Sequence, residues 1–301
     1  MERKTSVDTF GVIALVGFSL LSGFNQVVVK LVNDGMQPVF FAGLRSFGAL
    51  FCIGLWMMIR RKSFRIAPNT IGPGIFTGAL FTAEFFFLFL ALDYSNVSRV
   101  TILYFSMPIW VALAAHFFLP GERMSSIKAL GVALAFGGVA LAISERASSD
   151  EISLWGDVFA ILAAMFWAGI ALSVRLTPLA KESPEMQMMW QAGVSALVLL
   201  IIAPWFGPFL RDFTLFHAAG FVYQVVVGMS FAFVIWFWLI SIYPATSVAS
   251  FAFLSPIAGV VLGWGVLGET IGWATVCAIV LVAIGISLIN RPTPATELQS
   301  G

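Results

Sequence analysis

Ten apolar runs of about twenty residues each constrain what this chain can fold into more than any other feature. Polar residues separate the runs, whose predicted bounds are 10–31, 39–59, 71–92, 97–119, 127–144, 154–176, 186–206, 216–240, 246–267 and 271–289. A bilayer-spanning helix needs about 20 apolar residues, so the runs are long enough to span. They are continuously apolar and not alternating, which favours helices over the strands of a membrane barrel. We predict an all-α integral membrane protein with ten transmembrane helices.

Charged residues are too scarce to cover a water-soluble surface. Of 301 residues, 60% are apolar and 10% are charged, whereas soluble domains carry about 25% charged residues. The net charge of +1 gives no reason to expect a nucleic-acid partner. Cys52 and Cys277 both lie inside apolar runs, which argues against a disulfide framework or a metal site. We expect a lipid bilayer and a small molecule as partners, no cofactor, and a monomer.

Basic residues predict the orientation of the helices. With the N-terminus in the cytoplasm, eleven Lys and Arg residues fall in cytoplasmic segments and four on the opposite face. This bias agrees with the rule that cytoplasmic loops carry the excess of positive charge. The densest cluster is Arg60-Arg61-Lys62, after the second run. Both termini are therefore predicted to be cytoplasmic.

The two halves of the chain resemble each other at an offset of about 145–148 residues. The matched segments are Lys30-Leu31 with Arg175-Leu176, Pro108-Ile109 with Pro256-Ile257, Leu119-Pro120-Gly121-Glu122 with Val266-Leu267-Gly268-Glu269, and Gly138 and Leu141 with Gly285 and Leu288. Five helices per half is an odd number, so the second half must enter the membrane from the opposite side. We predict two inverted five-helix repeats, 1–148 and 149–301, around a central cavity, an architecture typical of secondary transporters.

Several of these motifs resemble those of the drug/metabolite transporter superfamily, EamA type. They are Ala91-Leu92-Asp93-Tyr94, Met107-Pro108-Ile109, Ser255-Pro256-Ile257 and the turns Gly121-Glu122 and Gly268-Glu269. The Trp-Gly pattern of the family is only partly kept, as Ser22-Gly23-Phe24-Asn25 and Phe166-Trp167-Ala168-Gly169. The resemblance covers nearly the whole chain. Within the superfamily the chain is similar to bacterial exporters of aromatic amino acids, which implies a transporter, not an enzyme, in the inner membrane.

Glu84 is the most informative single residue. It lies near the centre of the third run, where an acidic side chain costs about 2.5–3.5 kcal/mol on insertion scales. Thr77, Phe81, Glu84 and Leu88 share one helical face. Glu84 is predicted to line a cavity and bind a substrate ammonium or a coupling proton. The alternative is a structural hydrogen bond to a neighbouring helix.

Asn25 and Arg45 are the next polar candidates. An amide such as Asn25 can hold an amino-acid carboxylate or ammonium, or it can simply join two helices. Arg45 lies six residues into the second run. It could pair with Glu84, extend towards the membrane surface, or bind a substrate carboxylate.

The resemblance also implies that spans one, three, four, six, eight and nine line the cavity. On that basis Phe81, Tyr104, Trp167 and Trp236 are predicted to form its aromatic walls, with packing or lipid contact as the alternative. Pro108 and Pro256 occupy equivalent mid-span positions, and we predict paired hinges for alternating access or, alternatively, static kinks. Glu122 and Glu269 are predicted to cap the fifth and tenth helices.

The leading hypothesis is a secondary transporter that exports aromatic or hydrophobic amino acids by alternating access. Other drugs or metabolites, such as organic cations or purines, are alternative substrates. A lipid-modifying membrane enzyme is less well supported, because the chain has no HExxH, paired-Asp or GxSxG motif. The sequence has no nucleotide-binding loop motif, so it gives no indication that ATP drives transport.

Overall fold

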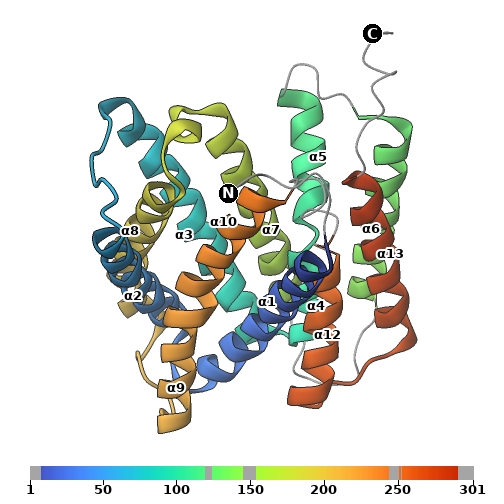
Figure 1. Cartoon of the computed structure of the whole chain (residues 1–301). Helices are drawn as coiled ribbons and strands as arrows, with labels where there is room; N and C mark the ends of the chain where they lie inside the picture. Colours follow the sequence, from blue (N-terminus) through green and yellow to red (C-terminus); the bar gives the residue numbers. More distant parts are fainter. Residues whose placement is uncertain (1–7, 119–123, 145–153, 244–250, 252, 291–301) are drawn as a thin grey trace, which may run out of the picture.

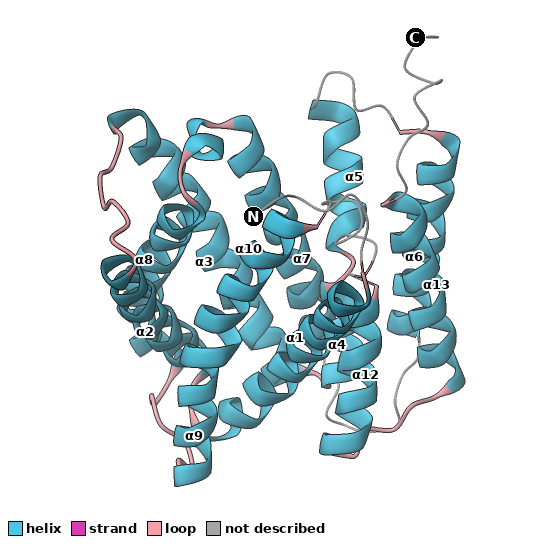
Figure 2. Cartoon of the chain, in the orientation of Figure 1, coloured by secondary structure: helices cyan, strands magenta, loops and turns pink. Residues whose placement is uncertain are grey.

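The computed structural model describes residues 8–118, 124–144, 154–243, 251 and 253–290, and these are helical with short connections (Figure 2). The α-helices are α1 (Thr9–Gly35), α2 (Pro38–Ile59), α3 (Ile71–Tyr94), α4 (Val97–Tyr104), α5 (Met107–Phe118), α6 (Ser126–Ser144), α7 (Leu154–Leu176), α8 (Pro184–Ile202), α9 (Leu215–Tyr223), α10 (Ala232–Ile242), α12 (Leu254–Leu267) and α13 (Trp273–Ile289). Short 3₁₀ turns are η1 (Pro68–Thr70), η2 (Pro178–Lys181) and η3 (Ala203–Phe206), and η4 (Gln224–Phe231) is a π-helix. The predicted all-α membrane fold is confirmed.

Helix starts follow capping chemistry in the sequence. Asp8 accepts the N–H of Gly11 at 2.8 Å at the start of α1, and Asn96 accepts that of Arg99 at 2.9 Å at the start of α4. Ser183 caps α8, with proline at the first helical position. Such caps satisfy backbone donors that have no partner within the helix. In an apolar run, where hydropathy marks no sharp boundary, they fix where each helix begins.

The helices are arranged as two edge pairs around a central group. α2 packs against α8 at one edge, and α6 packs against α13 at the other (Figure 1). Between them, α3 packs against α7, while α1 contacts α9, η4 and α10. Likewise α1 packs on α12, and α7 packs on α4 and α5. The contact of α3 with α7 corresponds to that of α1 with α9, η4 and α10, and the contact of α1 with α12 corresponds to that of α7 with α4 and α5. Exchanging the two halves therefore reproduces the same contacts, which is the pattern of a two-repeat membrane fold. The predicted division between 148 and 149 lies outside the described residues.

Glycines let the backbones of the edge pair α6 and α13 touch. A Cβ on Gly138 would lie 2.7 Å from the carbonyl oxygen of Ala278, and one on Gly285 would lie 2.6 Å from that of Gly131. In lipid the hydrophobic effect does not drive helices together, so small residues that permit close backbone packing stabilise such crossings. Gly138 and Gly285 are a matched pair of the internal repeat, so the repeat reproduces a packing requirement.

The fourth apolar run is not one continuous helix. α4 ends at Tyr104, and α5 starts at Met107. Pro108 is thus the second residue of α5, and Pro256 is the third residue of α12. The expectation that both prolines lie mid-helix is therefore wrong. In the first helical turn a proline removes no intrahelical hydrogen bond, so this is where a helix accepts it without loss.

Glu269 caps a different helix from the one predicted. Its carboxylate accepts the N–H groups of Val97 at 2.5 Å and Ser98 at 2.8 Å, together with the Ser98 hydroxyl. These groups start α4, not α13. The reason is the turn after α12: Gly268 adopts φ +69°, and α12 packs on α4, so the carboxylate reaches the buried N–H groups that start α4. The equivalent Glu122 lies outside the described residues.

The connection after η3 is joined to the end of the α1–α2 turn. Gln37 donates its N–H to the carbonyl of Phe209 at 3.0 Å. Arg211 holds both carboxylate oxygens of Asp93 at 2.7 and 3.0 Å and the carbonyl oxygen of Asn33 at 2.9 Å. The hydrogen bond to Asp93 raises the pKa of Arg211, which therefore stays charged. This ion pair ties the end of α3 to a loop of the second half.

Candidate functional site

A buried carboxylate lies where helices of the two halves meet. Glu84, on α3, is 3% exposed, and the hydroxyl of Tyr104 donates to its Oε1 at 2.6 Å. Trp167, on α7, stacks on the Tyr104 ring with centroids 4.8 Å apart and planes at 16°. Tyr104 is the last residue of α4, so the break in the fourth span positions its side chain. The structure therefore brings together three residues predicted separately for the site.

Arg45 lies close to this carboxylate but does not pair with it. Its side chain is fully buried, with the guanidinium 4.1 Å from the ring centre of Phe85 and 4.8 Å from that of Phe89. Phe85, against which the guanidinium lies, directly follows Glu84 on α3. Among the described residues, however, no carboxylate lies within 4.0 Å of the guanidinium. Nη1 is 3.4 Å from the Gln224 side-chain oxygen, and neither Nε nor Nη2 has an acceptor there.

Gln224 connects Arg45 to α1. It donates from Nε2 to the backbone carbonyl of Asn25 at 2.9 Å while its oxygen faces Arg45. The Oδ1 atom of Asn25 is buried with no donor among the described residues. It lies against Gly228, where a Cβ would be 2.4 Å away. Gln224 and Gly228 both belong to η4, and such π segments occur frequently at functional sites.

The other predicted aromatic residues divide between this site and the rest of the molecule. Phe81 is buried and meets Phe85 edge-on at 4.5 Å, so it continues the aromatic wall beside Arg45. Trp236 packs on Phe18 at 5.3 Å, in a separate cluster that includes Tyr243. The described contacts of Trp236 thus place it away from Glu84.

Sequence reasoning missed two features of the polar interior. Gln224 lies inside the eighth run and is not among the predicted site residues, although a polar amide in an apolar helix is itself an indication of a buried contact. Arg99 is one of the four basic residues counted on the non-cytoplasmic face in the prediction of orientation. It is 7% exposed and holds Asp157 through two hydrogen bonds of 2.5 Å each. Nothing in one sequence indicates that these two residues meet.

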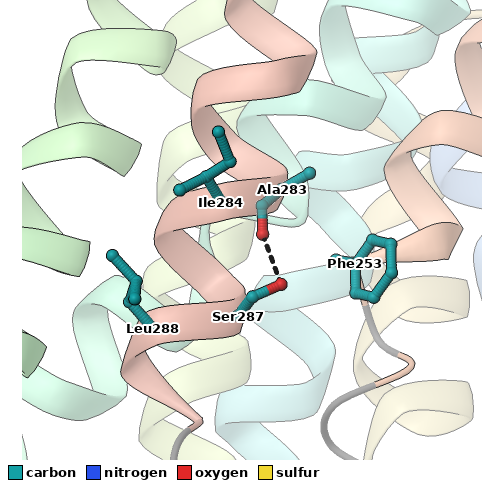
Figure 3. A pocket seen from close by; sticks show the side chains of 5 residues that line it. All are labelled: Phe253, Ala283, Ile284, Ser287 and Leu288. Carbon is teal, nitrogen blue, oxygen red and sulfur yellow. Dashed lines mark hydrogen bonds between the residues drawn. The ribbon is translucent and has the colours of Figure 1, made fainter.

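One small pocket lies apart from this polar cluster. Figure 3 shows its lining on α13 and the residue preceding α12: Phe253, Ala283, Ile284, Ser287 and Leu288. Its one polar side chain, Ser287, donates to the carbonyl of Ala283 in its own helix at 2.8 Å. No charged group is among the lining residues, so we assign the candidate site to the cluster around Glu84 and Arg45. In the described part of the chain, no group of His, Cys, Asp and Glu could hold a metal ion.

Two repeated helical halves with polar groups buried between them are typical of membrane transporters. The chain belongs to the EamA-like transporter family, whose model matches residues 9–144 and again 154–291. It is 26% identical to a probable amino-acid metabolite efflux pump of Salmonella typhimurium, over 88% of this chain and 89% of the relative. It is also 24% identical to the uncharacterized transporter YoaV of Bacillus subtilis, over 91% and 94%.

Two further comparisons concern membrane and fold. An uncharacterized inner membrane transporter of Escherichia coli, YedA, is 22% identical over 99% of this chain and 98% of that protein. A crystal structure with 17% sequence identity superposes with a TM-score of 0.67, covering 91% of this chain and 94% of the other. The latter shows the same fold. Together with the family, these likenesses establish a membrane transporter.

Proposed function

We propose that this protein is a secondary transporter that exports aromatic and hydrophobic amino acids by alternating access. The observation that carries the proposal is the Glu84 carboxylate, bound by the hydroxyl of Tyr104, whose ring stacks on Trp167 of the second half. A charged group deep in a membrane protein faces a partner or a pathway. Here it offers a site for a substrate ammonium group.

Aromatic surfaces beside the carboxylate favour a substrate with a ring or a bulky apolar side chain. Tyr104 and Trp167 already form a stacked pair, and Phe81 lies on the same helix as Glu84. A third ring stacked on such a pair gains about 0.5–1.5 kcal/mol beyond the burial of its area. The efflux-pump name of the Salmonella relative supports amino-acid metabolites as cargo and export as the direction.

Alternating access needs elements that hinge in both halves. Pro108 and Pro256 each lie in the first turn of a helix that follows non-helical or 3₁₀-like residues. We propose that these junctions bend as the two halves rock about the site. We place both termini in the cytoplasm, because the basic cluster Arg60-Arg61-Lys62 then follows the second span on the cytoplasmic face.

Organic cations are the strongest competing cargo. A carboxylate next to aromatic rings is also the chemistry that recognises quaternary or protonated amines. Purines would stack on the same rings, but nothing described selects their hydrogen-bonding edges.

Counterflow in proteoliposomes tests the proposal. Vesicles carrying the purified protein are loaded with unlabelled phenylalanine, and the entry of labelled phenylalanine, tryptophan and leucine is measured. Labelled tetraphenylphosphonium and adenine serve as the competing cargoes, and protein-free vesicles are the blank. Accumulation of the amino acids above the blank is expected. Movement of the cation or adenine alone would assign a different substrate, and movement of none would refute transport of these classes.

A further inference from the structure

The guanidinium of Arg45 is buried with one edge that lacks a hydrogen-bond acceptor among the described residues. The side chain is 1% exposed, lies inside α2, and is covered by the rings of Phe85 and Phe89. Nη1 alone approaches an acceptor, the Gln224 oxygen. Nε and Nη2 face none among the described residues. A guanidinium buried in this way is costly unless an anion meets it.

The same molecule shows what these two nitrogens bind. Arg99 uses Nε and Nη2 to hold Oδ1 and Oδ2 of Asp157, each at 2.5 Å. This two-pronged arrangement is the preferred geometry of an arginine with a carboxylate. Arg45 presents the same edge of its guanidinium, and the chain supplies no carboxylate to it in the described part. The two donors at that edge match the two oxygens of a carboxylate that belongs to another molecule.

Glu84 does not fill this role. Its Oε1 is taken by the hydroxyl of Tyr104, and it forms no ion pair with Arg45. The site therefore holds a guanidinium and a carboxyl group that do not pair with each other. An α-amino acid carries the complementary charges, with a carboxylate and an ammonium on adjacent carbons.

We propose that Arg45 binds the carboxylate of the transported molecule through Nε and Nη2 and thereby selects carboxylate-bearing substrates over the corresponding amines. Gln224 orients the guanidinium from its opposite side by accepting from Nη1, and it is itself held by the backbone of Asn25. Phe85 and Phe89 fix the plane of the guanidinium. This assignment rests on the proposed transport function and names the substrate group that this site recognises.

Matched pairs of ligands distinguish a failure of the Arg45 assignment from a failure of the proposed transport function. Wild-type proteoliposomes are tested with phenylalanine against phenethylamine and with tryptophan against tryptamine, which differ only by the carboxylate. We expect half-saturation at lower concentrations for each acid than for its amine. Movement of the amines but not the acids would overturn the role of Arg45 and leave a transporter in place. Movement of neither would refute the proposed function as well.

Substitutions at Arg45 then locate the selectivity. Arg45→Gln removes the charge, and Arg45→Lys keeps it without the two-pronged geometry. Both are expected to reduce the preference for acid over amine by at least about tenfold, as the loss of a charge-assisted pair implies. The ratio is read within one protein preparation, so a lower amount of folded protein does not alter it.

Ser46→Ala is the matched control on the same helix. Ser46 is buried, and its hydroxyl bonds Ser195 of α8 at 3.0 Å, whereas Arg45 contacts α3 and η4. It should leave the acid-to-amine ratio unchanged. If the Arg45 variants also keep the wild-type ratio, with both ligands losing affinity equally, Arg45 is structural and the proposal is wrong. If Arg45→Lys retains full selectivity, charge alone suffices and the two-pronged binding is wrong.

Discussion

Two buried arginines of this protein have opposite surroundings. Arg99, at the start of α4, is held by both oxygens of Asp157 and by the carbonyl of Ile143 at 2.8 Å. Arg45, within α2, has two aromatic rings and one amide oxygen around it. Among the described residues, the chain provides an anion to Arg99 and none to Arg45. A buried charge that the fold neutralises serves the fold, whereas one left to an outside molecule serves binding.

The first test of this comparison is whether removing the Arg99 charge lowers the free energy of unfolding. Arg99→Gln leaves the Asp157 carboxylate buried without its cation, since Asp157 is 3% exposed. Breaking one partner of a buried pair costs about 3–5 kcal/mol. We expect a loss of that size in the free energy of unfolding, measured by denaturant titration in mixed micelles.

The double variant Arg99→Gln/Asp157→Asn is the control for this largest effect. It removes both charges, so most of the lost stability should return. A single variant that loses less than about 1 kcal/mol would show that this pair does not hold the α4–α7 contact.

Glu84 should behave as a site residue, with a large effect on transport and a small one on stability. Glu84→Gln keeps an oxygen that accepts from Tyr104 but removes the charge offered to an ammonium. A hydrogen bond to a charged group is worth about 1.5–3 kcal/mol, so half-saturation for an amino acid should rise about 10–100-fold. Counterflow and unfolding are measured on the same preparation.

Thr82→Ala is the control for Glu84. Thr82 is buried on the same helix, and its hydroxyl donates to the carbonyl of Gly78 in its own helix at 2.7 Å. It should leave half-saturation as in the wild type. If Glu84→Gln instead lowers stability as much as the Arg99 variant, Glu84 belongs with the structural pair.

Trp167 is expected to have a smaller and more selective effect. Trp167→Leu removes the ring that stacks on Tyr104. Because aromatic stacking contributes about 0.5–1.5 kcal/mol, half-saturation for phenylalanine should rise about 3–12-fold, and that for leucine should change less. The measurement compares the two substrates in one set of vesicles.

Trp236→Leu tests whether that second ring belongs to the same site. Its contact with Phe18 predicts a smaller rise than at Trp167. Equal rises for both variants would place Trp236 in the binding site despite its described neighbours. Equal rises for phenylalanine and leucine at Trp167 would exclude stacking as the source of its effect.

Hydropathy and length predicted the helices well because both respond to the same requirement, the thickness of the bilayer. The runs 39–59 and 154–176 agree with α2 and α7 to within one residue. The ninth run, 246–267, begins outside the described residues, and α12 covers its second part. The break after Tyr104 and the π segment at Gln224 were not predicted, because a change in hydrogen-bond pattern leaves the apolar composition unaltered.

For the site, the residue types could be predicted but not their partners. Glu84, Tyr104 and Trp167 were each chosen from polarity, position or resemblance, and the structure joins them. The pairings of Arg99 with Asp157 and of Arg45 with Gln224 depend on how each helix is rotated about its axis. Several rotations bury the same apolar surface when a helix is apolar all round, so the sequence pattern does not select one.

An exposed ion pair completes the comparison, because it is also two-pronged, through Nη1 and Nη2 of Arg211, but lacks the burial of the Arg99 pair. Arg211 also holds both oxygens of its partner, yet its side chain is 39% exposed and that of Asp93 is 18% exposed. Exposed pairs contribute about 0.2–1 kcal/mol, because water competes with the partner. Asp93→Asn should therefore cost far less stability than Arg99→Gln.

Salt distinguishes the two pairs further. At about 1 M ionic strength charges in water are screened beyond about 3 Å, whereas buried ones are screened much less. The stability difference between wild type and Asp93→Asn should shrink in high salt, while the difference caused by Arg99→Gln should persist. If Asp93→Asn costs as much as Arg99→Gln, and salt affects both equally, then burial does not set the strength of these pairs. The same result would weaken the inference from burial to binding at Arg45.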